Sequence, residues 1–453
     1  MIGGHDHIDV TDGLAGRPWN TTTARVAVTK GISDVFLMKN QVRPYAWGSR
    51  TAIPTLLGAP SPSPEPQAEL WVGAHPADSS VLLRDGAEHP LRHAITDDPH
   101  ALLGSQVARE FGATLPFLLK LLAADAPLSL QAHPTAEQAR AGYDAEESAG
   151  VPIDAPFRNY KDRSHKPELM YALTPFEALC GFRPTEPTGQ LLAELAVPEL
   201  AELQATLAAQ PGEPGLRAVV TGLLTADRST VAPLVEAVAA ACAARAGTPG
   251  PFAREFAMGA QLAGHYPGDP GVLIALLMNR IDLAPGEAVF LPAGNMHAYL
   301  SGFGVEIMAS SDNVLRGGLT PKHVDVAELS AVVTFAPDEP MLIPAVPVGP
   351  GEHAFRTPTP EFELSRIVVP PTGRVLEHDG PQIVLVVEGS VTLTDAQGTQ
   401  LVVEPGRSVF LPARQGAVWL EGPGTLFRAK DGLVGTGTTG TAAVTEPAEL
   451  SLV

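Results

Sequence analysis

Gln131 and His133 can both bind a metal ion, and they lie two residues apart in the sequence. In a β-strand this spacing directs both side chains to the same face. The preceding run, residues 115–122, is largely apolar and contains one charge, Lys120, which requires a partner or a ligand there. A Gln-x-His pair alone is more often a hydrogen-bonded polar pair than a metal site. Further ligands must therefore come from elsewhere in the chain.

Glu168 is the third ligand candidate. It belongs to a charged block at residues 160–168, but Met170, Tyr171 and Phe176 follow it. This apolar setting favours an inward-pointing carboxylate, which needs a cation.

An internal repeat supplies the fourth candidate. Residues 283–302 and 403–422 match at one constant offset and share a Pro-Gly turn followed by Val-Phe-Leu-Pro-Ala. A turn, a short apolar strand, a second turn and another strand are typical of a cupin-type jelly roll. The first copy has His297 where the second has Ala417, so we expect only the first copy to bind metal.

Gln131, His133, Glu168 and His297 would offer two imidazoles, one carboxylate and one amide oxygen. Such nitrogen and oxygen ligands without thiolate suit zinc, while iron and manganese stay open. Structural zinc sites are usually rich in thiolate, so this set indicates a catalytic ion.

These residues require a scaffold that is mainly β with an α-helical insert. We expect two cupin-type jelly-roll domains and a helical domain, because residues 187–279 are rich in Ala and Leu at helical spacing. The predicted parts are a flexible N-terminal extension (1–37), a catalytic jelly roll (38–186 and 280–345), the helical insert (187–279), a C-terminal jelly roll without metal (346–430) and a loose tail (431–453).

Composition excludes several classes of function. The net charge of −20 argues against nucleic acid and anionic membranes as partners. The chain has no apolar run of membrane-spanning length, and its first 37 residues lack the apolar core of a secretory signal. Cys180 and Cys242 form no CxxC motif, so the cytoplasm is the expected compartment. We expect a monomer that acts on a small molecule.

Five ordered blocks resemble the type I mannose-6-phosphate isomerases, also called phosphomannose isomerases. The blocks are Tyr45-Ala46-Trp47-Gly48-Ser49, Ala68-Glu69-Leu70-Trp71 with Gly73-Ala74-His75-Pro76, Ser129-Leu130-Gln131-Ala132-His133-Pro134, Tyr160-Lys161-Asp162 with His165-Lys166-Pro167-Glu168, and Asp312-Asn313-Val314-Leu315-Arg316 with Thr320-Pro321-Lys322. The N-terminal extension, the divergent helical insert and the C-terminal tail depart from the family pattern. Read from its own residues, His75 is more typical of a structural histidine than of a ligand.

The resemblance implies one zinc ion held by Gln131, His133, Glu168 and His297. It also implies reversible interconversion of mannose 6-phosphate and fructose 6-phosphate, in which a proton moves between C1 and C2 through a cis-enediol.

The resemblance also implies roles for further residues. The proton-transfer group stays open among Glu306, Asp312, His165 and Lys166; a carboxylate, Asp312 or Glu306, is favoured, with assistance from Lys166. Arg316 is the expected electrostatic catalyst. The implied phosphate-binding residues are Ser129, Lys120, Arg316 and Lys322.

Two other functions fit parts of the pattern. Two histidines and a carboxylate on a cupin would also suit an iron(II) oxygenase, against which Gln131 and the basic residues argue. A non-catalytic bicupin that binds sugar phosphate is the other alternative, and the presence of Asp312, Glu306 and Arg316 argues against it.

Overall fold

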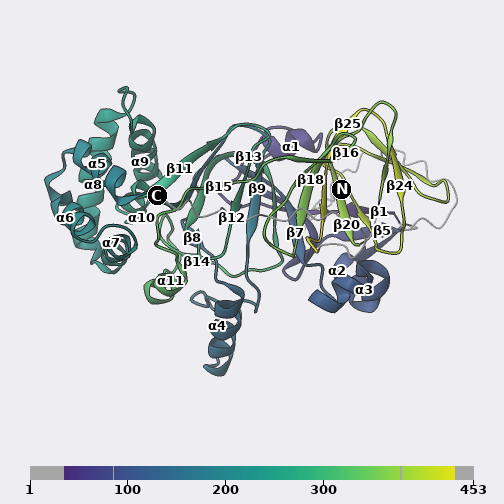
Figure 1. Ribbon diagram of the computed structural model, residues 1–453, viewed down its shortest axis with the longest axis horizontal. Helices are drawn as coiled ribbons and strands as arrows, with labels where there is room; N and C mark the ends of the chain where they lie inside the picture. The colour runs from purple at the N-terminus through teal and green to yellow at the C-terminus, as the bar shows by residue number, and fades with distance from the viewer. Residues whose placement is uncertain (1–34, 85, 378–379, 434–453) are drawn as a thin grey trace, which may run out of the picture.

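The computed structural model describes residues 35–84, 86–377 and 380–433. It confirms a mainly β protein with a helical insert: Figure 1 shows a bundle of helices at one end, a central β-barrel and a second β-unit at the other end. The predicted extension lies almost wholly outside the described residues, as does most of the predicted tail.

The central barrel is a twelve-stranded sheet. Its strands are β2 (Gln41–Arg43), β3 (Glu69–His75), β4 (Asp78–Ser79), β7 (Phe117–Ala124), β8 (Gln131–Ala132), β9 (Glu168–Ala172), β10 (Phe176–Phe182), β11 (Met278–Leu283), β12 (Ala288–Leu291), β13 (His297–Ala309), β14 (Leu315–Arg316) and β15 (Met341–Leu342).

Strand β13 is the centre of this sheet. Its first half pairs with β10 and β8, and its second half pairs with β7 and β9. The strand turns between the two halves at Gly302, whose φ is +125° and whose missing Cβ would lie 2.6 Å from the ring of Phe176. Only glycine suits this corner. Residues from both halves of β13 consequently face one interior.

The second β-unit combines a nine-stranded and a four-stranded sheet. The first contains β1 (Phe36–Lys39), β5 (Val81–Arg84), β6 (Ala87–Pro90), β16 (Val346–Gly349), β17 (Glu352–Phe355), β18 (Glu363–Val368), β20 (Gln382–Gly389), β23 (Ser408–Leu411) and β25 (Gly424–Lys430). The second contains β19 (Arg374–Leu376), β21 (Val391–Thr394), β22 (Gln400–Val403) and β24 (Val418–Glu421).

This arrangement differs from the predicted division in one respect. Strands β1, β5 and β6 come from the N-terminal part of the chain, yet they extend the C-terminal sheet, with Phe36 opposite Phe410. The pairing buries Phe36 and Met38 in the same core as Phe410 and Phe427. Apolar burial across two distant segments therefore joins parts that the sequence pattern separated.

The first half of the internal repeat has the same strands in both copies. Strands β11 and β22 end at Leu283 and Val403, and β12 (Ala288–Leu291) and β23 (Ser408–Leu411) follow the Pro-Gly turn at the same distance. The copies differ after the second turn, where β13 (His297–Ala309) is far longer than β24 (Val418–Glu421).

The helices are α1 (Ala52–Leu56), α2 (Leu91–Asp97), α3 (Pro99–Phe111), α4 (Ala136–Ser148), α5 (Thr185–Leu195), the 3₁₀ helix η1 (Pro198–Leu200), α6 (Ala201–Ala209), α7 (Glu213–Thr225), α8 (Arg228–Arg245), α9 (Ala253–His265), α10 (Gly271–Leu276) and α11 (Val326–Val332). Helices α5 to α10 form the bundle at one end of the molecule, and α4 projects from its central part (Figure 1). Among the described residues, no helix combines the length and the apolar character needed to cross a bilayer.

The helical insert packs on the wall that carries the predicted ligands. Helices α5 to α10 share one hydrophobic core with Leu130, Ala132, Met296 and Ala298, the neighbours of Gln131 and His297 in sequence. The insert leaves and rejoins the barrel at a single strand pair, where Phe182 lies opposite Met278. It therefore covers the back of the strands β8 and β13.

Candidate active site and metal centre

Three of the four predicted metal ligands form one buried group. His133 follows β8, Glu168 begins β9 and His297 begins β13, and one ligand atom from each lies within 4.8 Å of the others. Their exposed fractions are 1%, 2% and 0%. The fourth, Gln131, lies opposite both His297 and Arg316 in the strand register.

The hydrogen bonds of the two histidines fix their tautomers. Nδ1 of His133 lies 2.7 Å from the carbonyl oxygen of Asn313, and Nδ1 of His297 lies 3.0 Å from that of Asn295. A carbonyl oxygen only accepts, so each Nδ1 carries the proton and each neutral imidazole has a lone pair on Nε2.

Those lone pairs face a carboxylate. The Nε2 atoms of His133 and His297 lie 3.4 and 3.3 Å from the Glu168 oxygens. Oε2 of Glu168 and Nε2 of His297 are buried without any hydrogen-bond partner. Acceptors turned toward one another without a proton between them require a cation, and nitrogen and oxygen donors free of thiolate fit zinc. Burial also lowers the pKa of His133 to about 4, which keeps this imidazole free to coordinate.

Lys166 lies directly beside this group. Its Nζ is 2.6 Å from Oε1 of Glu168 and 3.5 Å from Nε2 of His133. Burial alone would raise the pKa of Glu168, but the positive charge of Lys166 and the interactions with His133 and His297 together outweigh it and hold that pKa well below the ordinary value. Glu168 is consequently a carboxylate and not a carboxylic acid.

A second buried network contains Glu306 from β13. Its carboxylate accepts hydrogen bonds from Nζ of Lys120 at 3.0 Å and from the hydroxyl of Tyr299 at 2.8 Å. Nζ of Lys120 also lies 3.9 Å from Glu69 and 5.3 Å from the ring centroid of Trp71. Burial lowers the pKa of Lys120, but the charges of Glu306 and Glu69 outweigh it and raise that pKa. Lys120 is thus already paired with carboxylates.

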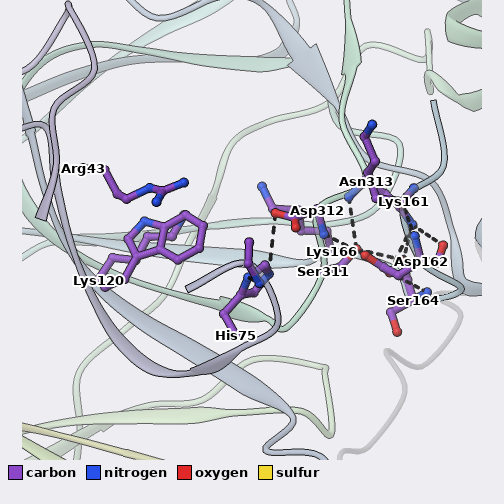
Figure 2. Close-up of polar contacts among 12 residues, drawn as sticks. Arg43, His75, Lys120, Lys161, Asp162, Ser164, Lys166, Ser311, Asp312 and Asn313 are labelled. Carbon is purple, nitrogen blue, oxygen red and sulfur yellow. Dashed lines mark hydrogen bonds and ion pairs between the residues drawn. The ribbon is translucent and has the colours of Figure 1, made fainter. Parts of the chain in front are cut away.

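Asp312 occupies a more open position. Its side chain is 42% exposed, and Oδ1 lies 3.5 Å from Nε2 of His75, as Figure 2 shows. Its backbone N–H donates to Oδ2 of Asp162 at 2.8 Å. Among the candidate proton-transfer carboxylates, Asp312 is therefore accessible and Glu306 is enclosed.

Arg316, one of the predicted phosphate-binding residues, lies beside the proposed ligand Gln131 in the strand register. Arg316 pairs with Gln131 in the strand ladder, and within the described residues its guanidinium forms no ion pair. Burial lowers the pKa of Arg316, and burial together with the charge of Arg316 lowers the pKa of Lys322. The charge of Arg316 thus acts on Lys322. Ser129 lies in the half-buried loop before β8.

His165 points elsewhere. Its Nε2 lies 2.7 Å from Oε1 of Glu361, in the loop between β17 and β18 of the C-terminal unit. It connects the two β-units, and its contacts do not join it to the metal group.

Asn313 holds the site together, although the sequence pattern gave its side chain no role of its own. Its Oδ1 accepts from the N–H groups of Lys161 and Asp162, and its Nδ2 donates to the carbonyl oxygens of Asp162 and Ser164 (Figure 2). Its own carbonyl accepts from His133. In the sequence, Asn313 belongs to the same block as Asp312, and its partners belong to the distant block Tyr160-Lys161-Asp162. Only the fold brings these two blocks into contact.

Comparisons with known proteins agree with this architecture. The family model "Phosphomannose isomerase type I, catalytic domain" matches residues 35–185, and "Mannose-6-phosphate isomerase, cupin domain" matches residues 351–430. The mannose-6-phosphate isomerase of Escherichia coli K12 is 40% identical over 391 residues, which cover 86% of this chain and 97% of that protein. The Homo sapiens enzyme is 33% identical over 412 residues, covering 85% and 92%.

Solved structures give the same result. The mannose 6-phosphate isomerase from Salmonella typhimurium, bound to substrate (f6p) and zinc, superimposes with a TM-score of 0.81 at 38% identity, covering 88% of this chain and all of that one. A zinc-bound mannose 6-phosphate isomerase aligns equally well, with a TM-score of 0.81 at 38% identity and the same coverage. The chain belongs to the type I mannose-6-phosphate isomerase family.

Proposed function

We propose that this protein is a zinc-dependent aldose–ketose isomerase that interconverts mannose 6-phosphate and fructose 6-phosphate. The observation that carries the proposal is the buried group of His133, Glu168 and His297, in which Oε2 of Glu168 and Nε2 of His297 face each other without a hydrogen-bond partner. Family membership supplies the reaction and the metal. We propose Gln131 as the fourth ligand because it is the neighbour of His297 in the strand ladder.

When bound, zinc would supply a Lewis acid that favours negative charge on the substrate oxygens at C1 and C2. The chain's own residues do the rest. Asp312 would take the proton from one carbon and return it to the other, because its carboxylate is accessible while Glu306 is engaged by Lys120 and Tyr299. Lys166 would keep Glu168 ionised.

Arg316, Lys322 and Ser129 would bind the phosphate. Arg316 is the best supported of the three, since its half-buried guanidinium has no ion-pair partner among the described residues and suits a phosphate geometrically. The contacts of Lys120 support a different role, which is to neutralise Glu306 and Glu69. Those of His165 support a link to the C-terminal unit. We further propose that the protein is a monomer and lies in the cytoplasm; the two free cysteines support the compartment.

The test is a coupled assay for fructose 6-phosphate formed from mannose 6-phosphate, run on metal-stripped protein before and after zinc is added. Turnover restored by zinc is expected. His297→Ala reproduces the residue found in the second repeat copy and should abolish zinc-restored turnover, while His353→Ala, at an exposed histidine of the C-terminal unit, should not. Folded, zinc-loaded wild-type protein without turnover would refute the proposal and favour a sugar-phosphate binder.

A further inference from the structure

His75 is a buried imidazole that the proposed mechanism has not used. It ends strand β3 and is only 2% exposed. The ring contacts the edge of Trp71 at a centroid distance of 4.9 Å. Such a histidine can be simple core packing, so its two nitrogen atoms decide whether it does more.

The backbone fixes its tautomer. The N–H of Ala77 donates to Nδ1 of His75 at 3.2 Å, in the tight turn between β3 and β4. A ring nitrogen that accepts carries no proton, so the neutral imidazole has its proton on Nε2. Burial, assisted by the charges of Lys120, Lys166 and Arg43 and opposed by the charge of Asp312, lowers the pKa of His75 to about 4. The ring is therefore neutral near pH 7.

The remaining N–H faces a single carboxylate. Nε2 of His75 lies 3.5 Å from Oδ1 of Asp312 (Figure 2). The backbone of Asp312 is held separately, by Asp162, through its N–H. The backbone and the side chain of Asp312 are thus held from two directions, while 42% of that side chain remains exposed.

We propose that His75 is a positioning residue for Asp312: its Nε2–H fixes the orientation of the carboxylate that exchanges the substrate proton. The inference rests on the proposed function, since the contact between His75 and Asp312 affects catalysis only if Asp312 acts on the substrate. Holding a reactive group in one orientation removes the entropic cost of ordering it in the transition state. A donor on Oδ1 also stabilises the ionised form that a base requires.

Two variants separate this role from packing. In His75→Asn the amide can still accept from Ala77 but is too short to reach Asp312, whereas His75→Gln restores an N–H near the position of Nε2. We expect His75→Asn to lower kcat by about tenfold with KM changed less than twofold, and His75→Gln to recover most of the loss. The acid limb of the kcat–pH profile should move to higher pH in His75→Asn alone.

A double-mutant cycle makes the test specific. If His75 acts through Asp312, His75→Asn should have no further effect in an Asp312→Asn background. Equal losses of kcat in both backgrounds, or an unchanged kcat in His75→Asn with normal zinc content and melting temperature, would overturn the inference.

A measurement without turnover separates this inference from the proposed function. In wild-type protein with ¹⁵N-labelled histidine, Nε2 of His75 should carry the proton, and its chemical shift should change in Asp312→Asn. An unchanged shift would refute the pairing, even if a His75 variant failed to fold. If the shift changes in Asp312→Asn but the wild-type protein shows no turnover, the proposed function is refuted instead.

Discussion

Asn313 offers the sharpest test of how the loops hold the metal group. Its side chain is fully buried and forms four hydrogen bonds to backbone groups, between 2.7 and 3.2 Å, from one loop to another. At about 1 kcal/mol net for each bond, Asn313→Ala should lower the free energy of unfolding by about 4 kcal/mol. For a domain of this size the melting temperature should fall by about 10 °C.

The same substitution should weaken metal binding. The carbonyl of Asn313 accepts the 2.7 Å hydrogen bond that orients His133, and loosening it frees the ring to turn. Loss of a group that hydrogen-bonds to a metal ligand typically lowers metal affinity by about 10- to 100-fold. Asn313→Asp should be more harmful than alanine, because a carboxylate oxygen would replace the NH₂ group that faces two carbonyl oxygens and, at 3.3 Å, the carboxylate of Asp162.

The assay is competition for zinc against a chromophoric chelator, with thermal unfolding of the metal-free protein followed by circular dichroism. Asn159→Ala is the matched control, since that side chain forms one half-buried hydrogen bond, to Asp325 at 3.0 Å. It should cost no more than about 1.5 kcal/mol and leave zinc affinity unchanged. Wild-type zinc affinity in Asn313→Ala would refute the reasoning, as would an equal loss in the control.

Three further predictions concern single side chains. Lys166→Met should lower kcat by about 10- to 100-fold, because it removes the largest of the charges that keep Glu168 ionised. Steady-state kinetics measure this, and Lys161→Met, whose Nζ donates to the exposed carbonyl of Ile153, should behave as wild type. Arg316→Ala should raise KM for mannose 6-phosphate by about 10- to 100-fold, because a charge-assisted hydrogen bond to the phosphate is lost. It should also weaken competitive inhibition by inorganic phosphate. An unchanged KM would exclude Arg316 from phosphate binding. Burial lowers the pKa of His75 to about 4 in the folded state, against about 6.5 in the unfolded chain. Between these two pH values the unfolded chain binds more protons, so the free energy of unfolding should fall as the pH decreases. Melting temperatures at pH 7.5 and pH 5 should therefore differ less in His75→Gln than in wild type, and an equal difference would contradict this.

Much of the architecture was predictable because the repeat has a local signature. The Pro-Gly turn and the Val-Phe-Leu strand that follows it recur at one offset, and the structure has paired strands at both places. The helical insert was readable from its apolar period. By contrast, residues 91–111 form two helices: α2 ends at Asp97 and α3 begins at Pro99, because the backbone of Asp98 is not helical before the proline.

Long-range pairing set the limit of sequence reasoning. No local pattern in residues 36–39 indicates a partner near residue 410, since any apolar strand could fill that edge. The same holds at the site. The charge of Lys120 in an apolar run predicted a partner or a ligand, and the family resemblance implied phosphate. Only the register that puts Glu306 beside Lys120 reveals the carboxylate partner. The types of the site residues were readable from sequence, whereas their pairing depended on strand register.

The shared core of the helical insert has an evolutionary consequence. Because Phe182 and Met278 are paired, the insert is joined to the barrel at a single point and can diverge in length or sequence without altering the barrel's strand order. Yet its apolar side chains pack behind Ala132 and Ala298, each adjacent to a proposed zinc ligand. Substitutions far from the substrate could thereby alter how firmly the metal is held, so natural variation in this insert offers selection a way to adjust zinc affinity while the ligands themselves stay the same.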